Sequence, residues 1–150
     1  LLQMCFIFFG LPEVGIVFPR FTTAVVAFVI NYTAYFAEIF RGGIQSISKG
    51  QYEAAYMLGL TKPQTFFRII LPQVVKRVLP ASANEVITLV KDTSLAQVIA
   101  VTELFALAKK QQAAYASIYP LFVAGVFYYV ANLLLSLLFA YAERKLNYYK

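Results

Sequence analysis

The chain has 150 residues, of which 61% are hydrophobic and only 13% are charged, and its mean hydropathy is +0.69. This charged fraction is about half that of an ordinary soluble domain and predicts a membrane protein. The sequence contains no histidine, no Walker A loop and no metal-spaced cysteine cluster, so we expect no enzyme activity, no metal site and no cofactor in this chain.

The beginning of the chain predicts two apolar helical segments. Residues 1–12 are expected to be the end of a transmembrane helix, because the stretch "LLQMCFIFFG" is about half a span long and has no initiator methionine. We therefore expect the chain to be incomplete at its N-terminus. Residues 21–40 are predicted to form a transmembrane helix, because the run is uncharged as far as residue 37 and would be about 30 Å long as a helix.

Residues 44–72 form a polar connection rich in lysine and arginine, which the positive-inside rule places in the cytoplasm. The net charge of +6 does not indicate a nucleic-acid partner, because the basic residues stand at the ends of apolar segments. A DNA-reading helix-turn-helix is disfavoured for the same connection, since it is short and is followed and preceded by membrane spans.

The spacing of polar residues predicts two short helices in this connection. Ser48 with Gln51 and Thr61 with Gln64 both have the capping-box spacing that marks the start of a helix. Gly59 is expected to end the first of the two helices.

The first of these helices should place Ala54, Ala55 and Leu58 on one face that can lie in a partner's groove. Glu53 would stand near the start of the helix, where the macrodipole favours an acid, and would suit a charge-assisted bond to an arginine of another protein. The open alternative is an ordinary cytoplasmic loop in which Glu53 is a solvated surface charge.

Three segments complete the chain. Residues 78–100 are apolar enough to enter a bilayer but contain three charged residues, so we expect a polar transmembrane helix with a break in it. Residues 101–118 are expected to lie on the outer side. Residues 119–142 are uncharged and have tyrosines near both ends, which predicts another transmembrane helix.

The connection also carries the spacing of a known motif. Glu53-Ala54-Ala55, then Gly59, then Ile69-Ile70-Leu71-Pro72 resemble the EAA motif of permease subunits of ABC-type importers. The stretches "AEIFRGGIQSISKGQYEAA" and "LVKDTSLAQVIAVTEL" resemble the polar amino acid branch, which includes histidine, arginine and glutamine importers. This resemblance covers nearly the whole chain. It implies an all-α, polytopic helical bundle in the bacterial cytoplasmic (inner) membrane, with the N-terminal helix missing.

The family resemblance also implies partners. The chain would form the translocation path with a second permease subunit, as a homodimer or a heterodimer. It would receive a polar amino acid from an extracytoplasmic solute-binding protein and would couple to a separate ATP-binding subunit that hydrolyses ATP. By their positions in the motif, the coupling residues would be Glu53, Ala54, Ala55, Gly59, Ile69, Leu71 and Pro72. An ATP-independent channel and a purely structural membrane subunit remain the alternatives.

Polar stripes on two of the predicted spans indicate where substrate could pass, because polar residues at helical spacing inside a membrane face protein or water. The stripes consist of Asn31, Tyr35 and Glu38 in the first span, and of Glu85, Thr88 and Asp92 in the second.

A break is predicted at Lys91-Asp92-Thr93-Ser94, because Ser94 and Gln97 have capping-box spacing. A helix that starts inside the membrane offers free N–H groups to a substrate carboxylate, and Glu38 and Glu85 could meet ammonium or guanidinium groups. The alternative is that Lys91 and Asp92 neutralise each other, that the stripes are contacts between helices, and that Glu38 pairs with Arg41.

Overall fold

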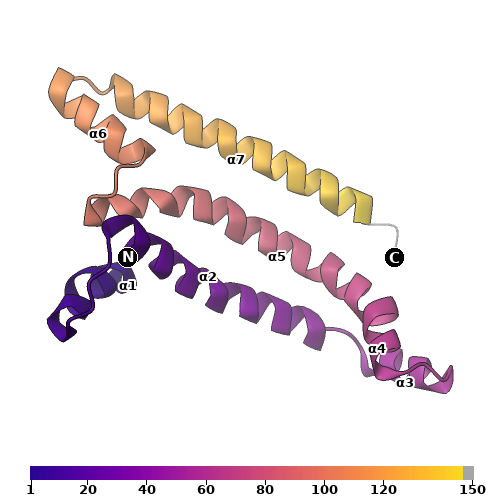
Figure 1. Ribbon diagram of the computed structural model, residues 1–150. Coiled ribbons are helices and arrows are strands. Elements are labelled where there is room, and N and C mark those ends of the chain that lie inside the picture. Colours follow the sequence, from indigo (N-terminus) through magenta and orange to yellow (C-terminus); the bar gives the residue numbers. More distant parts are fainter. Residues whose placement is uncertain (147–150) are drawn as a thin grey trace. The chain divides into compact units, whose positions relative to one another are not determined.

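The computed structural model describes residues 1–146, and every regular element in this range is helical (Figure 1). In chain order the elements are α1 (Leu2–Cys5), a π-helical turn (Phe6–Gly10), a 3-10 turn (Leu11–Val14), α2 (Arg20–Gln45), α3 (Lys49–Met57), α4 (Lys62–Thr65), a second π-helical turn (Phe66–Ile70), α5 (Leu71–Asp92), a 3-10 helix (Thr93–Ile99), α6 (Leu104–Tyr115) and α7 (Tyr119–Leu146).

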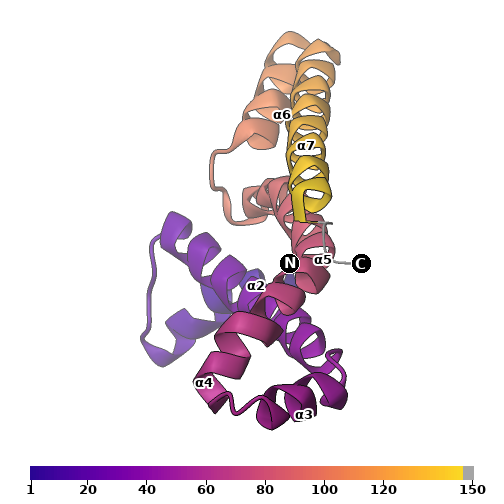
Figure 2. The same ribbon diagram turned by 90° about the vertical axis from the view of Figure 1, so that its right-hand side faces the viewer.

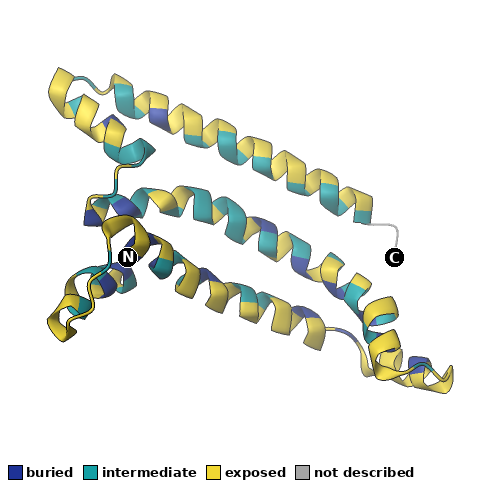
Figure 3. Cartoon of the chain, in the orientation of Figure 1, coloured by how far each residue is buried: buried dark blue, intermediate teal, exposed yellow. Residues whose placement is uncertain are grey.

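The helices expected at residues 21–40 and 119–142 are present. They are α2, with 26 residues, and α7, with 28, and both are long and apolar enough to cross a membrane. Little of either helix is buried within the chain, and Figure 3 accordingly draws α7 mostly in the yellow and teal of exposed and intermediate residues. An apolar helix with so much open surface needs lipid or another protein around it.

The predicted connection and the predicted third span share one continuous helical run. Helical backbone runs without interruption from Lys62 to Ile99, through α4, the second π-helical turn, α5 and the 3-10 helix. The second short helix predicted in residues 44–72 is therefore the beginning of this long run. The capping signal marked the correct starting point, but the helix does not stop after it. Pro72 lies just after the π-helical turn and Pro80 lies inside α5, and the helix continues through both prolines.

The chain divides into two compact units. The first unit comprises Leu1–Thr33 with Val86–Leu135, and the second comprises Ala34–Glu85 with the chain from Ser136 onward. In the first unit, the buried core joins three segments that are far apart in the sequence, namely the N-terminal turns, α2 and the 3-10 helix. Its buried members are Met4, Ile7, Ala24, Ala27, Ala96 and Ile99.

The core of the second unit ties the end of α2 to the start of α5. Ile47, Ile70, Val74 and Val78 are buried together there. Gly43 lies against this cluster, and a Cβ atom at that position would overlap Cγ1 of Val78. The backbones of α2 and α5 thus approach each other closely in this unit. The guanidinium of Arg77 also donates to the carbonyl of Ser46, just beyond the end of α2.

Candidate coupling segment and polar pocket

The helix α3 begins where the sequence predicted, but its cap differs from the prediction. Ser48 is the N-cap residue and has an extended backbone, yet its side chain makes no capping hydrogen bond. The amide of Gln51 donates instead to the backbone carbonyl of Ser48, at 3.1 Å. The capping box expected for Ser48 and Gln51 is therefore wrong, because the tight first turn already supplies an acceptor for that amide.

Gly59 ends α3 as predicted. It has φ +71°, the left-handed conformation that glycine adopts at little cost. The amide of Gly59 donates to the carbonyl of Tyr56 at 2.9 Å, and that of Leu60 donates to the carbonyl of Ala55 at 3.1 Å. These two bonds are the Schellman motif. They turn the chain sharply into the next helix and hold the orientation of α3.

The capping box predicted at Thr61 is confirmed. The hydroxyl of Thr61 accepts from the amide of Gln64, and the Gln64 side chain accepts from the amide of Thr61 at 2.9 Å. Pro63 lies within the first turn of α4, as expected. Since this cap follows the Schellman turn after one residue, α3 and α4 meet at a rigid corner (Figure 2).

Two details of the prediction for α3 are wrong. Glu53 is the fifth residue of the helix and not part of its first turn, so the macrodipole adds little there. The expected face of Ala54, Ala55 and Leu58 is also divided, because Ala55 is 1% exposed and Leu58 is 77% exposed. Ala55 packs inward beside the Schellman turn, and this leaves Glu53 and Ala54 on the exposed side.

The second half of the motif lies in the core of the second unit. Ile70 is fully buried, Ile69 and Leu71 are half-buried, and Pro72 is exposed at the start of α5. One turn further on, the side-chain amide of Gln73 donates to the carbonyl of Ile69 at 2.9 Å and to Oε1 of Gln51 at 3.4 Å. The buried Ile70 therefore anchors this half of the motif in the core, and Gln73 links α3 to the start of α5.

An apolar groove accompanies α3. It has a volume of about 460 Å³ and lies between the side of α3 and the start of the next helical run. Its lining residues are Tyr52, Tyr56, Leu60, Lys62, Thr65 and Phe66. Tyr56 is strongly exposed. A groove rimmed by exposed aromatic residues is typical of a surface that receives another protein.

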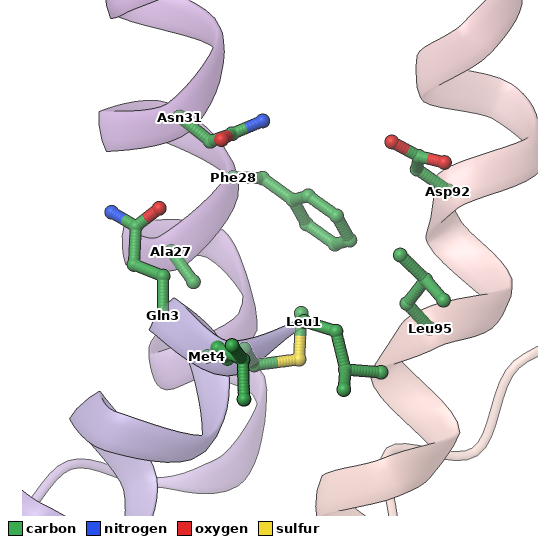
Figure 4. A pocket seen from close by; sticks show the side chains of 9 residues that line it. Leu1, Gln3, Met4, Ala27, Phe28, Asn31, Asp92 and Leu95 are labelled. Atoms are coloured by element: carbon green, nitrogen blue, oxygen red, sulfur yellow. The ribbon is translucent and has the colours of Figure 1, made fainter.

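A second concave site lies in the first unit, between Asn31 and Asp92. It is a pocket of about 400 Å³, shown in Figure 4. Asn31 on α2 and Asp92 at the end of α5 stand on opposite sides, with the ring of Phe28 between them. Gln3 adds a second amide from α1. The other lining residues are apolar, namely Leu1, Leu2, Met4, Ala27 and Leu95.

Asp92 has a partner that the sequence did not indicate. The hydroxyl of Tyr32 donates to Oδ2 of Asp92 at 2.9 Å, from a position 60 residues away. Tyr32 is buried and follows Phe28 by one helical turn, so the two aromatic residues share one side of α2. This spacing was the feature of the sequence that could have indicated that Tyr32 faces another segment. Among the described residues no ion pair joins Lys91 to Asp92, so the pairing that the alternative supposed is not present.

The break predicted at residues 91–94 takes another form. The helix changes from α to 3-10 geometry at Thr93 and continues to Ile99. Ser94 does not cap a new helix. Its hydroxyl donates to the carbonyl of Lys91 at 2.8 Å, and the hydroxyl of Thr93 donates to that of Val90 at 2.7 Å. Both hydroxyls therefore bond back to the preceding turn of the same helix, as serine and threonine side chains do inside a continuing helix.

The other residues of the polar stripes are not part of this pocket. Tyr35 and Glu38 belong to the second unit, where both are exposed, and the predicted pairing of Glu38 with Arg41 is confirmed. Glu85 also belongs to the second unit and is half-buried. Thr88 is exposed on α5 within the first unit.

Sequence reasoning missed a further polar contact in the first unit. Glu103 caps α6, because its carboxylate accepts from the amides of Phe105 and Ala106. The same carboxylate accepts from the hydroxyl of Tyr128 on α7, at 3.0 Å. An acid just before the apolar run from Leu104 was a readable N-cap signal, whereas its partner on α7 was not.

A family model described as "Binding-protein-dependent transport system inner membrane component" matches residues 1–148. The chain belongs to this family. As a binding-protein-dependent permease component it is a transport subunit, and the family is one of the inner membrane. The resemblance derived from the EAA spacing is therefore confirmed.

Several relatives of this permease component are amino-acid permeases. A probable amino-acid ABC transporter permease protein of Sinorhizobium fredii is 43% identical over 71% of this chain and 46% of its own length. The arginine transport system permease protein ArtQ of Bacillus subtilis is 40% identical over 97% of this chain and 68% of its own length. The chain thus spans about half to two thirds of the length of these relatives.

The fold of the permease component is also that of a solved transporter. The crystal structure of an amino acid ABC transporter with histidines matches it with a TM-score of 0.86 and 36% sequence identity. The match covers 96% of this chain and 68% of the solved chain. The all-α permease fold implied by the sequence resemblance is confirmed.

Proposed function

We propose that the protein is the membrane subunit of an ATP-driven importer of polar amino acids, and that α3 transmits the movement of a separate ATPase subunit to the transmembrane helices. The observation that carries this proposal is the fixed position of α3. Three features hold this short helix at the start of α5. They are the Schellman turn at Gly59, the cap at Thr61 and the hydrogen bond from Gln73 to Gln51. A force on α3 would therefore reach α5 directly.

The exposed side of α3 supplies the surface for the ATPase. Glu53 and Ala54 are exposed beside the apolar groove, so a partner could meet a small side chain, a carboxylate and aromatic rings within one patch. A carboxylate held on a rigid helix suits a charge-assisted bond with an arginine of the partner. Ala55 and Gly59 act differently, since they shape the helix and its turn.

The polar pocket of the first unit is our candidate for part of the substrate path. The amides of Gln3 and Asn31 can donate to a carboxylate, and Asp92 can accept from an ammonium group. This combination complements the two ends of a zwitterionic amino acid. In this proposal the side-chain amides of Gln3 and Asn31 donate to the substrate carboxylate, in place of the free helix N–H groups that the sequence led us to expect. The assembly with a second permease subunit and a solute-binding protein is part of the same proposal.

Coupling through α3 can be tested by affinity purification of the tagged protein from native membranes, with mass spectrometry of co-purifying proteins. We expect an ATPase with a Walker A loop to accompany the wild type and to be depleted by Glu53→Ala. Glu13→Ala is the matched control, because Glu13 is also an exposed acid but lies outside the coupling segment. If no ATPase is recovered even after crosslinking, the importer proposal is wrong, and an ATP-independent channel or a structural membrane subunit becomes the better interpretation.

The role of the pocket can be tested by amino-acid uptake into vesicles that contain the complete transporter. Loss of one charge-assisted hydrogen bond should lower kcat/KM by at least about tenfold in Asp92→Asn. Glu85→Gln removes a carboxylate from the same helix outside the pocket and should have a much smaller effect. Equal effects of the two substitutions would contradict the assignment of Asp92. ATP-independent uptake by the wild type would favour a channel.

A further inference from the structure

The second unit contains a pocket that neither the coupling segment nor the substrate path uses. It has a volume of about 310 Å³ and lies between α5 and α7. Its lining combines charged and apolar side chains. The lining residues are Lys76, Leu79, Pro80, Ala140, Glu143, Arg144 and Leu146.

The charges of this pocket stand at one end of both helices. Lys76 and Arg77 are neighbours near the start of α5, and Arg144 and Lys145 are neighbours in the last turn of α7. Among the lining residues, the two basic side chains of Lys76 and Arg144 stand against the single acid Glu143, so the pocket has an excess of positive charge. By the positive-inside rule, this end of the helices belongs to the cytoplasmic surface of the membrane.

The apolar part of the pocket continues along α7. Leu137, Ala140 and Arg144 are spaced by three and four residues, so they share one side of the helix. Leu137 is exposed. A molecule with an anionic head at Arg144 could therefore lay a hydrocarbon chain along this apolar side of α7. Pro80 and Leu79 form the opposing apolar wall from α5.

We propose that this pocket binds an anionic phospholipid, with the headgroup phosphate held by Lys76 and Arg144 and the acyl chain against Leu137 and Ala140. Basic pockets between transmembrane helices on the cytoplasmic side recognise such headgroups. A free phosphate would not use the apolar walls. A zwitterionic lipid would place its ammonium group near Glu143 but would gain less from the surplus of basic residues. This inference goes beyond the proposed transport function and does not depend on it.

The test is native mass spectrometry of the delipidated, detergent-purified assembly, titrated with phosphatidylglycerol or with phosphatidylethanolamine. We expect saturable binding of phosphatidylglycerol and weaker binding of phosphatidylethanolamine. Each basic residue near an anionic headgroup contributes a comparable part of the binding free energy. The double substitution Lys76→Gln with Arg144→Gln should therefore weaken phosphatidylglycerol binding by roughly thirtyfold. Lys109→Gln with Lys110→Gln is the matched control, because it removes the same charge from exposed residues of α6.

A second variant protects the test against misfolding of the first. Ala140→Phe keeps every charge but fills the apolar part of the pocket, so it should also lower phosphatidylglycerol binding while the helical content of the protein stays unchanged. Three results would each overturn the proposal. These are equal binding of the two lipids, an equal loss in the Lys109 and Lys110 control, and displacement of phosphatidylglycerol by inorganic phosphate at similar concentrations.

Discussion

The hydroxyl of Tyr32 on α2 donates a hydrogen bond to the carboxylate of Asp92 at the end of α5, at 2.9 Å. This bond joins two helices within the first unit and orients the acid that lines the polar pocket. It supports the view that the polar stripes include contacts between helices. The same geometry leaves Asp92 facing Asn31 across the pocket, so a structural bond and a ligand contact can coexist at one carboxylate.

Tyr32→Phe should lower the thermal stability of the purified protein. It removes one hydrogen bond between helices, which in membrane proteins is worth about 0.6–1.7 kcal/mol. Tyr129→Phe is the control, because Tyr129 is exposed on α7. The measurement is the unfolding midpoint in detergent. A Tyr32 variant as stable as the wild type would show that the bond to Asp92 contributes nothing.

Gly43→Ala should destabilise the second unit, whereas Gly42→Ala should not. A Cβ atom at Gly43 overlaps Val78, while a Cβ atom at Gly42 meets nothing within 4 Å. Overpacking of this kind costs about 1–3 kcal/mol, but alanine inside a helix is otherwise favoured over glycine by about 0.5–1 kcal/mol. The two unfolding midpoints should therefore move in opposite directions. Val78→Ala in the Gly43→Ala background should restore part of the loss; no recovery would contradict the contact.

Gly59→Ala should destabilise the turn after α3 by about 1 kcal/mol, since a left-handed conformation is costly for a residue with a side chain. Gly50→Ala is the control within the same segment, because Gly50 is helical and a Cβ atom there has free space. Hydrogen exchange of the amides of Gly59 and Leu60 reports on the turn. We expect faster exchange in Gly59→Ala only, and unchanged exchange would argue against the Schellman turn.

Thr61→Ala should loosen the start of α4, and Ser48→Ala should leave α3 nearly unchanged. Loss of a capping side chain costs about 0.5–2 kcal/mol, but only where that side chain accepts a hydrogen bond. The structure shows such a bond for Thr61 and none for Ser48. Hydrogen exchange at Gln64 and Gln51 compares the two caps directly. Equal protection losses at the two positions would mean that Ser48 also caps its helix.

Features that depend on neighbouring residues could be predicted from the sequence. The apolar runs that became α2 and α7, the stop at Gly59, the cap at Thr61 and the pairing of Glu38 with Arg41 all arise within a few residues of one chain segment. The motif around Glu53 also has a fixed local spacing, which is why the family could be identified. Backbone geometry and helical periodicity are sufficient for such inferences.

Only the tertiary structure decided which distant residues meet. The bond between Tyr32 and Asp92, the approach of Gly43 to Val78 and the inward position of Ala55 depend on how separate segments pack. A sequence records side-chain types but not which of several chemically suitable partners packing brings within reach. A local pattern can also be used in another way than predicted, since the Ser94 hydroxyl is bonded to the turn before it and does not start a helix.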